Sequence, residues 1–200
     1  MIYHSVLLLL AFNLINNVTG QRTAIAHLRD GVVNGTVLFT EMDEGLRVTG
    51  IITGLTAGEY GFHVHELGDT DTCDTAGAHF NPDGNNHAGR EDPVRHVGDL
   101  GNVIFVGNDT AIAVFDYVDT VIALRGRNDI LGRTLVLHEE RDDLGLGGVD
   151  ASLTTGNAGG RVACGVIGIK YPAEPWNSAA SVNPSLVLFI LVLTVFFSFM

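Results

Sequence analysis

The stretch Gly61-Phe62-His63-Val64-His65 decides how the fold is predicted, because it places two histidines at alternate positions of an apolar segment. Successive side chains of a β-strand point to opposite faces, so His63 and His65 would share one face. Similar short segments, separated by Gly and Asp, recur along the chain. The predicted strands are residues 24–29, 36–41, 46–53, 60–65, 102–106, 111–117, 134–138 and 162–169. Because no segment keeps a helical period, these eight strands predict an antiparallel all-β sandwich or barrel.

The composition limits the class of protein. The 200 residues suit one domain with short appendages. A charged fraction of 17% excludes a disordered acidic chain, and 2 cysteines exclude a cysteine-dense mini-protein or a four-cysteine zinc module. The net charge is −12, from 11 Lys and Arg against 23 Asp and Glu. We therefore expect no nucleic-acid partner, since binding to phosphates requires a basic face.

Both ends of the chain carry apolar segments outside the predicted strands. Residues 1–20 have the pattern of a secretory signal peptide, with an apolar run and small residues before a cut at Gln21. Residues 185–200 form a hydrophobic tail, and the linker 171–184 before it holds two candidate attachment residues, Asn177 and Ser178. The tail is short and lacks a flanking basic cluster, so we expect a glycosylphosphatidylinositol (GPI) signal rather than the alternative, a retained membrane helix.

The remaining chain, residues 21–170, would then be one extracellular domain tethered to the outer face of the plasma membrane. Its only membrane contact would be the lipid anchor or the tail. Secretion exposes the chain to an oxidising compartment, so Cys73 and Cys164 can form a disulfide. The Asn-x-Ser/Thr triplets at Asn34 and Asn108 are candidate glycosylation sites of the same domain.

Two long polar segments, residues 66–98 and 139–160, interrupt the strand pattern. Loops of this length in a compact domain are usually either functional or disordered. Histidines gather in or beside them, and Asp99 follows the first segment closely. Three imidazoles and a carboxylate can close a tetrahedral zinc site, and further imidazoles suit copper. One histidine alone is more often structural, but the six His63, His65, His79, His87, His96 and His138 together predict metal binding.

Four segments resemble the copper/zinc superoxide dismutase family, in order and with similar spacing. They are Gly61–Asp69 (GFHVHELGD), Ala76–Pro82 (AGAHFNP), Arg95–Asn102 (RHVGDLGN) and Gly156–Gly168 (GNAGGRVACGVIG). The resemblance covers nearly all of residues 24–170. It implies an eight-stranded antiparallel Greek-key β-barrel with a metal-binding loop and an electrostatic loop. It also implies one copper and one zinc ion per subunit, and conversion of superoxide to O2 and H2O2.

The resemblance assigns the metal ligands residue by residue. The copper ligands would be His63, His65, His79 and His138. The zinc ligands would be His79, His87, His96 and Asp99, so that His79 bridges the two ions and gives a proton during turnover.

The resemblance also assigns residues around the metals. Asp142 would link a copper ligand to a zinc ligand, and Cys73 and Cys164 would form the intrasubunit disulfide. Arg161 would guide the superoxide anion against the acidic charge of the domain, and Thr155 would narrow the channel. A homodimer is also implied, because small or apolar residues remain at the matching positions Leu67, Gly68, Leu131, Gly132, Gly168 and Ile169.

The chain departs from the family pattern in the second loop. The family usually carries two acids and a lysine there, but this chain has Asp150, Ala151 and Thr154 at those positions. We therefore expect weaker long-range steering of superoxide. The main alternative function is a catalytically weak copper- and zinc-binding module at the cell surface. The presence of Arg161 and Thr155 favours the enzyme over that module.

Overall fold

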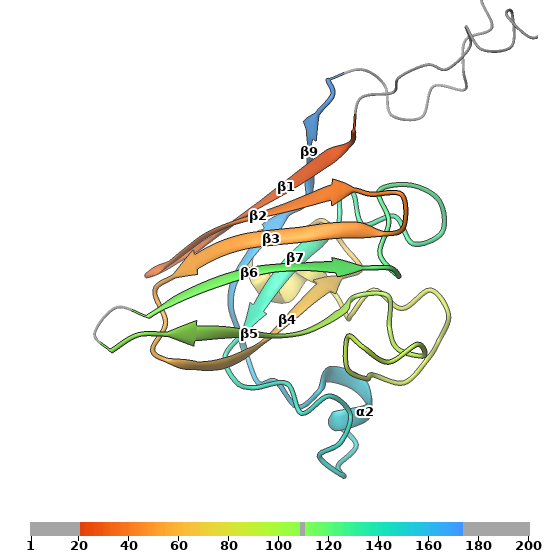
Figure 1. Ribbon diagram of the computed structural model, residues 1–200. Coiled ribbons are helices and arrows are strands. Elements are labelled where there is room, and N and C mark those ends of the chain that lie inside the picture. Colours follow the sequence, from red (N-terminus) through yellow and green to blue (C-terminus); the bar gives the residue numbers. More distant parts are fainter. Residues whose placement is uncertain (1–20, 109–110, 174–200) are drawn as a thin grey trace, which may run out of the picture.

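The computed structural model describes residues 21–108 and 111–173, which form an antiparallel β-barrel (Figure 1). Nine strands lie within these residues. They are β1 (Thr23–Asp30), β2 (Val33–Glu41), β3 (Leu46–Thr53), β4 (Gly58–His65), β5 (Asp99–Val106), β6 (Ile112–Asp119), β7 (Thr134–His138), β8 (Arg161–Val166) and β9 (Gly168–Tyr171). The predicted all-β class is therefore confirmed. The predicted bounds of residues 46–53 and 134–138 match β3 and β7.

The strand order is β8-β7-β4-β5-β6-β3-β2-β1-β9, and every pairing is antiparallel. The neighbours β3–β6 and β4–β7 are not consecutive in sequence, as a Greek-key connection requires. β8 ends this order, and β1 is next to last at the other end; these two strands pack against each other, so the sheet curls into a nearly closed barrel. The arrangement matches the predicted Greek-key barrel.

The strand count differs from the predicted eight because the predicted strand 162–169 divides at Ile167. There the Ile167 amide donates to Arg133 O, and its carbonyl accepts from Gly132 N. The residues before Ile167 pair with β7 as β8, whereas those after it pair with β1 as β9. The single apolar run 162–169 therefore forms two strands with different partners, β7 for the first strand and β1 for the second.

The barrel core is built from alternate residues of the strands. Val37, Phe39, Val48 and Ile52 are fully buried, as their alternation predicts. In contrast, all residues of β7 and the last five of β4 are buried. Both faces of these two strands are covered, because one faces the core and the other lies under the long loops. This second covered face carries the histidines.

Each long loop contains one short helix that the sequence analysis did not predict. These are the 3-10 helix η1 (Cys73–Ala76) and the helix α2 (Ser152–Thr155). In Figure 1, α2 lies beneath the barrel. Each has 4 residues, too few to produce a helical period in the sequence. No helix among the described residues is long and apolar enough to cross a membrane. The predicted leader, tail and attachment residues Asn177 and Ser178 lie outside the described residues.

The seam between β1 and β8 allows a test of barrel closure. A side chain at Gly165 would overlap the backbone carbonyl of His27 across the seam. We expect Gly165→Ala to lower the free energy of unfolding by about 1–3 kcal/mol, because a backbone carbonyl cannot move without opening the seam. Gly168→Ala is the matched control, since the nearest atom to its new methyl group would be Ile25 O at 4.0 Å. Denaturant unfolding of the oxidised proteins measures both, and equal stabilities would contradict the prediction.

Candidate metal centre

Strands β4 and β7 supply three of the six clustered histidines. His63 and His65 lie on the same face of β4, opposite the buried core residues Phe62 and Val64. The neighbouring strand β7 ends at His138. All three imidazoles are buried, because the two long loops cover this face of the barrel. The strands thus hold them rigidly before any loop residue is added.

The first donor group consists of His63, His65, His79 and His138. Each can offer one ligand atom, and these atoms lie within 4.8 Å of one another. The outer ring nitrogens are already engaged: His65 Nδ1 lies 2.9 Å from Gly77 O, and His138 Nδ1 lies 3.4 Å from Gly159 O. Their Nε2 atoms lie 3.3 Å apart. The remaining nitrogens therefore converge on one point inside the group.

The second donor group consists of His79, His87, His96 and Asp99, all buried. Its centre is Asp99 Oδ1, which lies 2.9 Å from His79 Nδ1, 2.9 Å from His87 Nδ1 and 3.1 Å from His96 Nδ1. Three imidazoles and a carboxylate at one point form the donor set that the sequence predicted for zinc. The first polar loop supplies the three histidines, and Asp99 begins β5.

His79 belongs to both donor groups. Its Nδ1 faces Asp99, whereas its Nε2 is buried and has no hydrogen-bond partner in the described part of the chain. His63 Nδ1 is a second buried nitrogen that makes no hydrogen bond to the described residues. A buried polar atom without a partner is costly, and metal ions can satisfy these nitrogens. The residues present therefore fit two metal ions that share one imidazole.

Asp142 joins the two donor groups from outside. Its Oδ2 lies 2.9 Å from His63 Nε2, and its Oδ1 lies 2.8 Å from His87 Nε2. These are the ring nitrogens that face away from the group interiors, and the distances are those of hydrogen bonds. An acceptor at Nε2 fixes each tautomer so that Nδ1 carries the lone pair for a metal. This geometry supports the predicted linking role of Asp142.

Two further residues position Asp142, and the sequence analysis did not assign them a role. Asn102 holds the Asp142 backbone at both ends: Asn102 Nδ2 donates to Asp142 O at 2.9 Å, and Asp142 N donates to Asn102 Oδ1 at 2.8 Å. Gly156 has φ +65°, and any side chain on it would overlap Asp142 Oδ1. Both lie within the quoted family-like segments, but only the fold brings them beside Asp142.

Burial keeps the first donor group neutral in the metal-free protein. Burial lowers the pKa of His63 and of His79. It also lowers the pKa of His65 to about 2 and that of His138 to about 4, and electrostatic repulsion from His79 lowers these two values further. Neutral imidazole is the form that binds copper and zinc, so these four rings need not release a proton to accept a metal.

The second donor group, unlike the neutral first group, contains ionised side chains. Burial by itself would raise the pKa of Asp99, but hydrogen bonds with His79, His87 and His96 hold it well below its usual range. Burial would likewise lower the pKa of His87, yet hydrogen bonds with Asp142 and Asp99 raise it to about 9. An ionised carboxylate is therefore present at the group centre, which favours binding of a cation.

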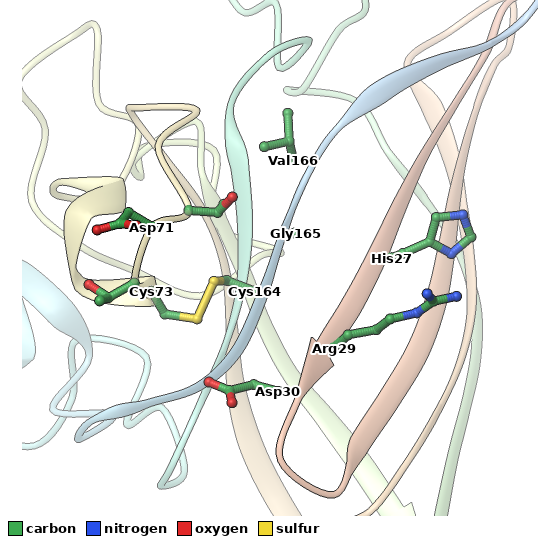
Figure 2. A pocket seen from close by; sticks show the side chains of 10 residues that line it. His27, Arg29, Asp30, Asp71, Cys73, Cys164, Gly165 and Val166 are labelled. Atoms are coloured by element: carbon green, nitrogen blue, oxygen red, sulfur yellow. A yellow bond between two sulfur atoms is a disulfide. The ribbon is translucent and has the colours of Figure 1, made fainter.

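The disulfide predicted between Cys73 and Cys164 is confirmed. It ties η1 of the first loop to β8, as Figure 2 shows beside His27 and Arg29 of β1. A cavity of about 490 Å³ borders it, and no candidate metal ligand lines this cavity. The disulfide therefore serves to fix the loop against the barrel rather than to line the donor groups.

Arg161 begins β8 and reaches across to the same loop. Its guanidinium donates to Cys73 O at 2.7 Å and to Gly77 O at 2.6 Å. Gly77 O also faces His65 Nδ1 at 2.9 Å, so Arg161 and a ligand of the first donor group share one carbonyl. This places a cation at the edge of the first donor group.

The other predicted site residues lie farther out. Thr155 ends α2 and is exposed, and its hydroxyl donates to Ala151 O at 3.1 Å. Asn34 and Asn108 are exposed on the barrel surface, in β2 and after β5. Neither asparagine belongs to the donor groups.

Comparison with known proteins identifies the family. The family model for copper/zinc superoxide dismutase (SODC) matches residues 33–167. This chain belongs to the copper/zinc superoxide dismutase family. It is 54% identical over 140 residues to superoxide dismutase [Cu-Zn] A of Xenopus laevis, covering 69% of this chain and 91% of that one. It is 51% identical over 153 residues to superoxide dismutase [Cu-Zn] 2 of Brassica juncea, covering 76% and 99%.

A solved structure supports the same assignment. The crystal structure of the clock protein EA4 is similar with a TM-score of 0.72 and 49% identity, covering 78% of this chain and 99% of that one. The family model and the two relatives named superoxide dismutase [Cu-Zn] show that this chain is a Cu/Zn superoxide dismutase, an oxidoreductase. Family membership and the two donor groups together support one copper and one zinc ion per subunit.

The link through Asp142 can be tested by metal affinity. In Asp142→Asn the amide has one acceptor oxygen, so it cannot accept from both His63 and His87. We expect the affinity for both metals to fall by about 10–100-fold, because each ring loses its fixed tautomer and orientation. Copper and zinc retained against graded chelator concentrations measure this.

The neighbouring Asp143→Asn is the matched control for that experiment. Asp143 accepts from Ser152 Oγ at 2.7 Å and from Gly145 N at 3.0 Å, and it contacts neither ring. This variant should retain both metals as the unsubstituted protein does. Equal losses in the two variants would show that loop acidity, rather than the link between the rings, governs affinity.

Proposed function

We propose that this chain converts two superoxide anions and two protons into O2 and H2O2 outside the cell. The observation that carries the proposal is the pair of buried donor groups sharing His79, with the Arg161 guanidinium at their edge. The all-nitrogen first group suits copper, and the second group, with its carboxylate, suits zinc. His63, His65, His79 and His138 would hold copper, and His79, His87, His96 and Asp99 would hold zinc.

Copper held by His63, His65, His79 and His138 would supply the one-electron redox chemistry of this reaction. The chain supplies geometry, a proton position and a local positive charge. His79 can hold and release a proton at Nε2, the buried atom that lacks a hydrogen-bond partner among the described residues. Asp142 keeps His63 and His87 oriented throughout, because its contacts lie outside both donor groups.

Arg161 places a positive charge beside the first donor group of an otherwise acidic protein. The substrate is an anion, and the chain carries a net charge of −12. A cation held by two backbone carbonyls beside the first donor group attracts the anion locally, where the field of the distant acids is weaker. Thr155 would narrow the approach from the second loop, as the family resemblance implies.

The role of Arg161 can be separated from metal loading. We expect Arg161→Ala to lower dismutase activity about tenfold or more at unchanged copper and zinc content, because the local attraction for the anion is lost. Arg161→Lys should recover part of the activity, since it restores the charge but not the paired hydrogen bonds. Stopped-flow decay of superoxide with metal analysis of each sample measures this.

A surface arginine provides the control for that comparison. Arg47 pairs with Asp116 on the outer face of the barrel, so Arg47→Ala removes one positive charge away from the donor groups. Its activity should remain close to that of the unsubstituted protein. Full metal content with no activity in the unsubstituted protein would instead favour the catalytically weak metal-binding module.

We also infer secretion and anchoring by GPI at Asn177 or Ser178. The apolar ends and the small residues before the tail support this inference, and the disulfide between Cys73 and Cys164 suits an oxidising compartment. The setting favours defence against superoxide that originates outside the cell.

The anchor can be tested on intact cells that express the full chain. A phospholipase specific for GPI should release the protein into the medium, because the lipid alone would retain it. A chain ending at residue 184 serves as the control and should appear in the medium without the enzyme. Full-length protein that stays with the cells after phospholipase treatment would contradict the anchor and favour the retained membrane helix.

We further infer a homodimer through the surface around Leu67 and Ile169, which are 50% and 54% exposed. Gly68 and Gly132 make this surface compact, because a side chain at Gly68 would overlap Gly132 O. Leu131 and Gly168 complete the predicted set. An apolar, closely packed surface of this kind is typical of a two-fold interface.

A further inference from the structure

The outer surface of the barrel carries an apolar face that includes no residue of the loops that hold the metal ligands. Five aliphatic side chains form it: Ile51 (58% exposed), Ile104 (58%), Val106 (70%), Ile112 (42%) and Val114 (69%). They lie on β3, β5 and β6, which run side by side in Figure 1. We call this set the aliphatic face. None of these side chains contributes to the core or to the donor groups.

The strand register makes the aliphatic face continuous. Ile51 pairs directly with Val114, and Ile112 pairs directly with Val106. Ile104 lies two residues before Val106 and on the same side of β5. Directly paired residues on one face have side chains in contact range, so the five form one cluster. An exposed aliphatic cluster usually marks a surface that something covers.

Candidate glycosylation sites lie at both ends of this cluster. One row of paired residues crosses four strands: Asn34, Thr53, Ile112 and Val106. Asn34 is exposed at one end, and its side-chain amide makes no hydrogen bond to the described residues. At the other end, Asn108 follows Val106 by two residues and is also exposed. Both asparagines begin Asn-x-Thr triplets.

We propose that N-linked glycans on Asn34 and Asn108 cover the aliphatic face. The proposal rests on the inferred entry of the chain into the secretory pathway. Neighbouring strands are about 4.8 Å apart, so Asn34 and Val106 are separated by about 14 Å, which two branched glycans can span from opposite ends. Each amide nitrogen forms a bond to C1 of the first sugar and loses a proton, the bond from C1 to the pyrophosphate oxygen of the lipid-linked donor breaks, and the lipid pyrophosphate leaves.

Glycans explain the aliphatic face better than a lipid surface or a protein partner. None of the five side chains is basic or aromatic, and the cation on the same outer surface of β3 and β6, Arg47, is already paired with Asp116. Basic and aromatic side chains usually anchor proteins to membranes or to other proteins. The overall charge of −12 also opposes contact with anionic lipids. Bulky sugars at both ends would in addition keep a flat partner away.

The experiment uses the full chain as animal cells produce it. Mass spectrometry of its peptides reports whether Asn34 and Asn108 carry glycans. A water-soluble carbene reagent then labels exposed side chains in the native protein and in the double variant Asn34→Gln/Asn108→Gln. We expect labelling of the aliphatic face to rise at least about twofold in the variant, because the covering sugars are gone. Labelling of Leu146, which is 84% exposed in the second loop, should not change.

A second variant isolates the apolar surface itself. Without glycans the protein should form aggregates that light scattering detects, and adding Ile51→Thr, Val106→Thr and Val114→Thr should restore the monodisperse state. Threonine keeps the β-branched shape that strands favour. Dismutase activity and metal content, measured on the same samples, should not change, since none of these residues belongs to the site.

Distinct results would overturn the proposal. A secreted chain with bare Asn34 and Asn108 rejects the glycans but leaves secretion intact, whereas a chain that stays in the cytosol without glycans rejects both. Equal labelling with and without glycans shows that sugars do not cover the face. If the aliphatic face of the double variant stays protected from labelling but loses this protection on dilution, a second copy of the chain covers it. If the protection from labelling requires lipid, a membrane covers it. Loss of activity at unchanged glycosylation would concern the dismutase function alone.

Discussion

Buried imidazole nitrogens that find no hydrogen-bond partner among the described residues are the constraint on which this structure depends. His63 Nδ1 and His79 Nε2 lie in the covered face of β4 and the loop above it, where water does not reach them. Such atoms oppose folding unless a ligand satisfies them. The two polar loops have little apolar core of their own, so binding of copper and zinc contributes directly to their order. We therefore expect metal binding to be coupled to the order of these loops.

The anion site and the metal ligands share supports. Gly77 O accepts from Arg161 and faces His65, and the disulfide at Cys73 fixes the short helix just before this carbonyl. A shift of the first loop would move the guanidinium and the imidazole together. Asp142 has a similar double role, because one carboxylate orients a ring of each donor group. The anion-binding arginine and the metal ligands therefore cannot move independently, because the same backbone and side-chain contacts attach them to the barrel.

The barrel uses its outer faces in two different ways. The outer face of β4 and β7 is buried under loops and holds polar ligands, whereas that of β3, β5 and β6 is exposed and carries aliphatic side chains. Each departs from the usual pattern in which a solvated face is polar. In the first case metal ions account for the departure, and in the second we assign the covering to sugars attached to the chain. Strand alternation produces both the histidine face and the aliphatic face, because the side chains that do not point into the core point to the outer surface of the barrel.

The sequence by itself determined the fold class, most strand positions and the ligand residues. Alternation placed Phe39 and Val48 inward and His63 beside His65, since the period of a strand is a local property. The family resemblance indicated Asp142, Arg161 and the disulfide. Tertiary structure alone decided the division at Ile167, because only pairing with β7 and then with β1 separates the two strands. It also decided the roles of Asn102 and Gly156, and it brought Asn34 into line with Val106 across four strands. These relations join residues far apart in the chain, and strand register, which no local pattern encodes, sets them.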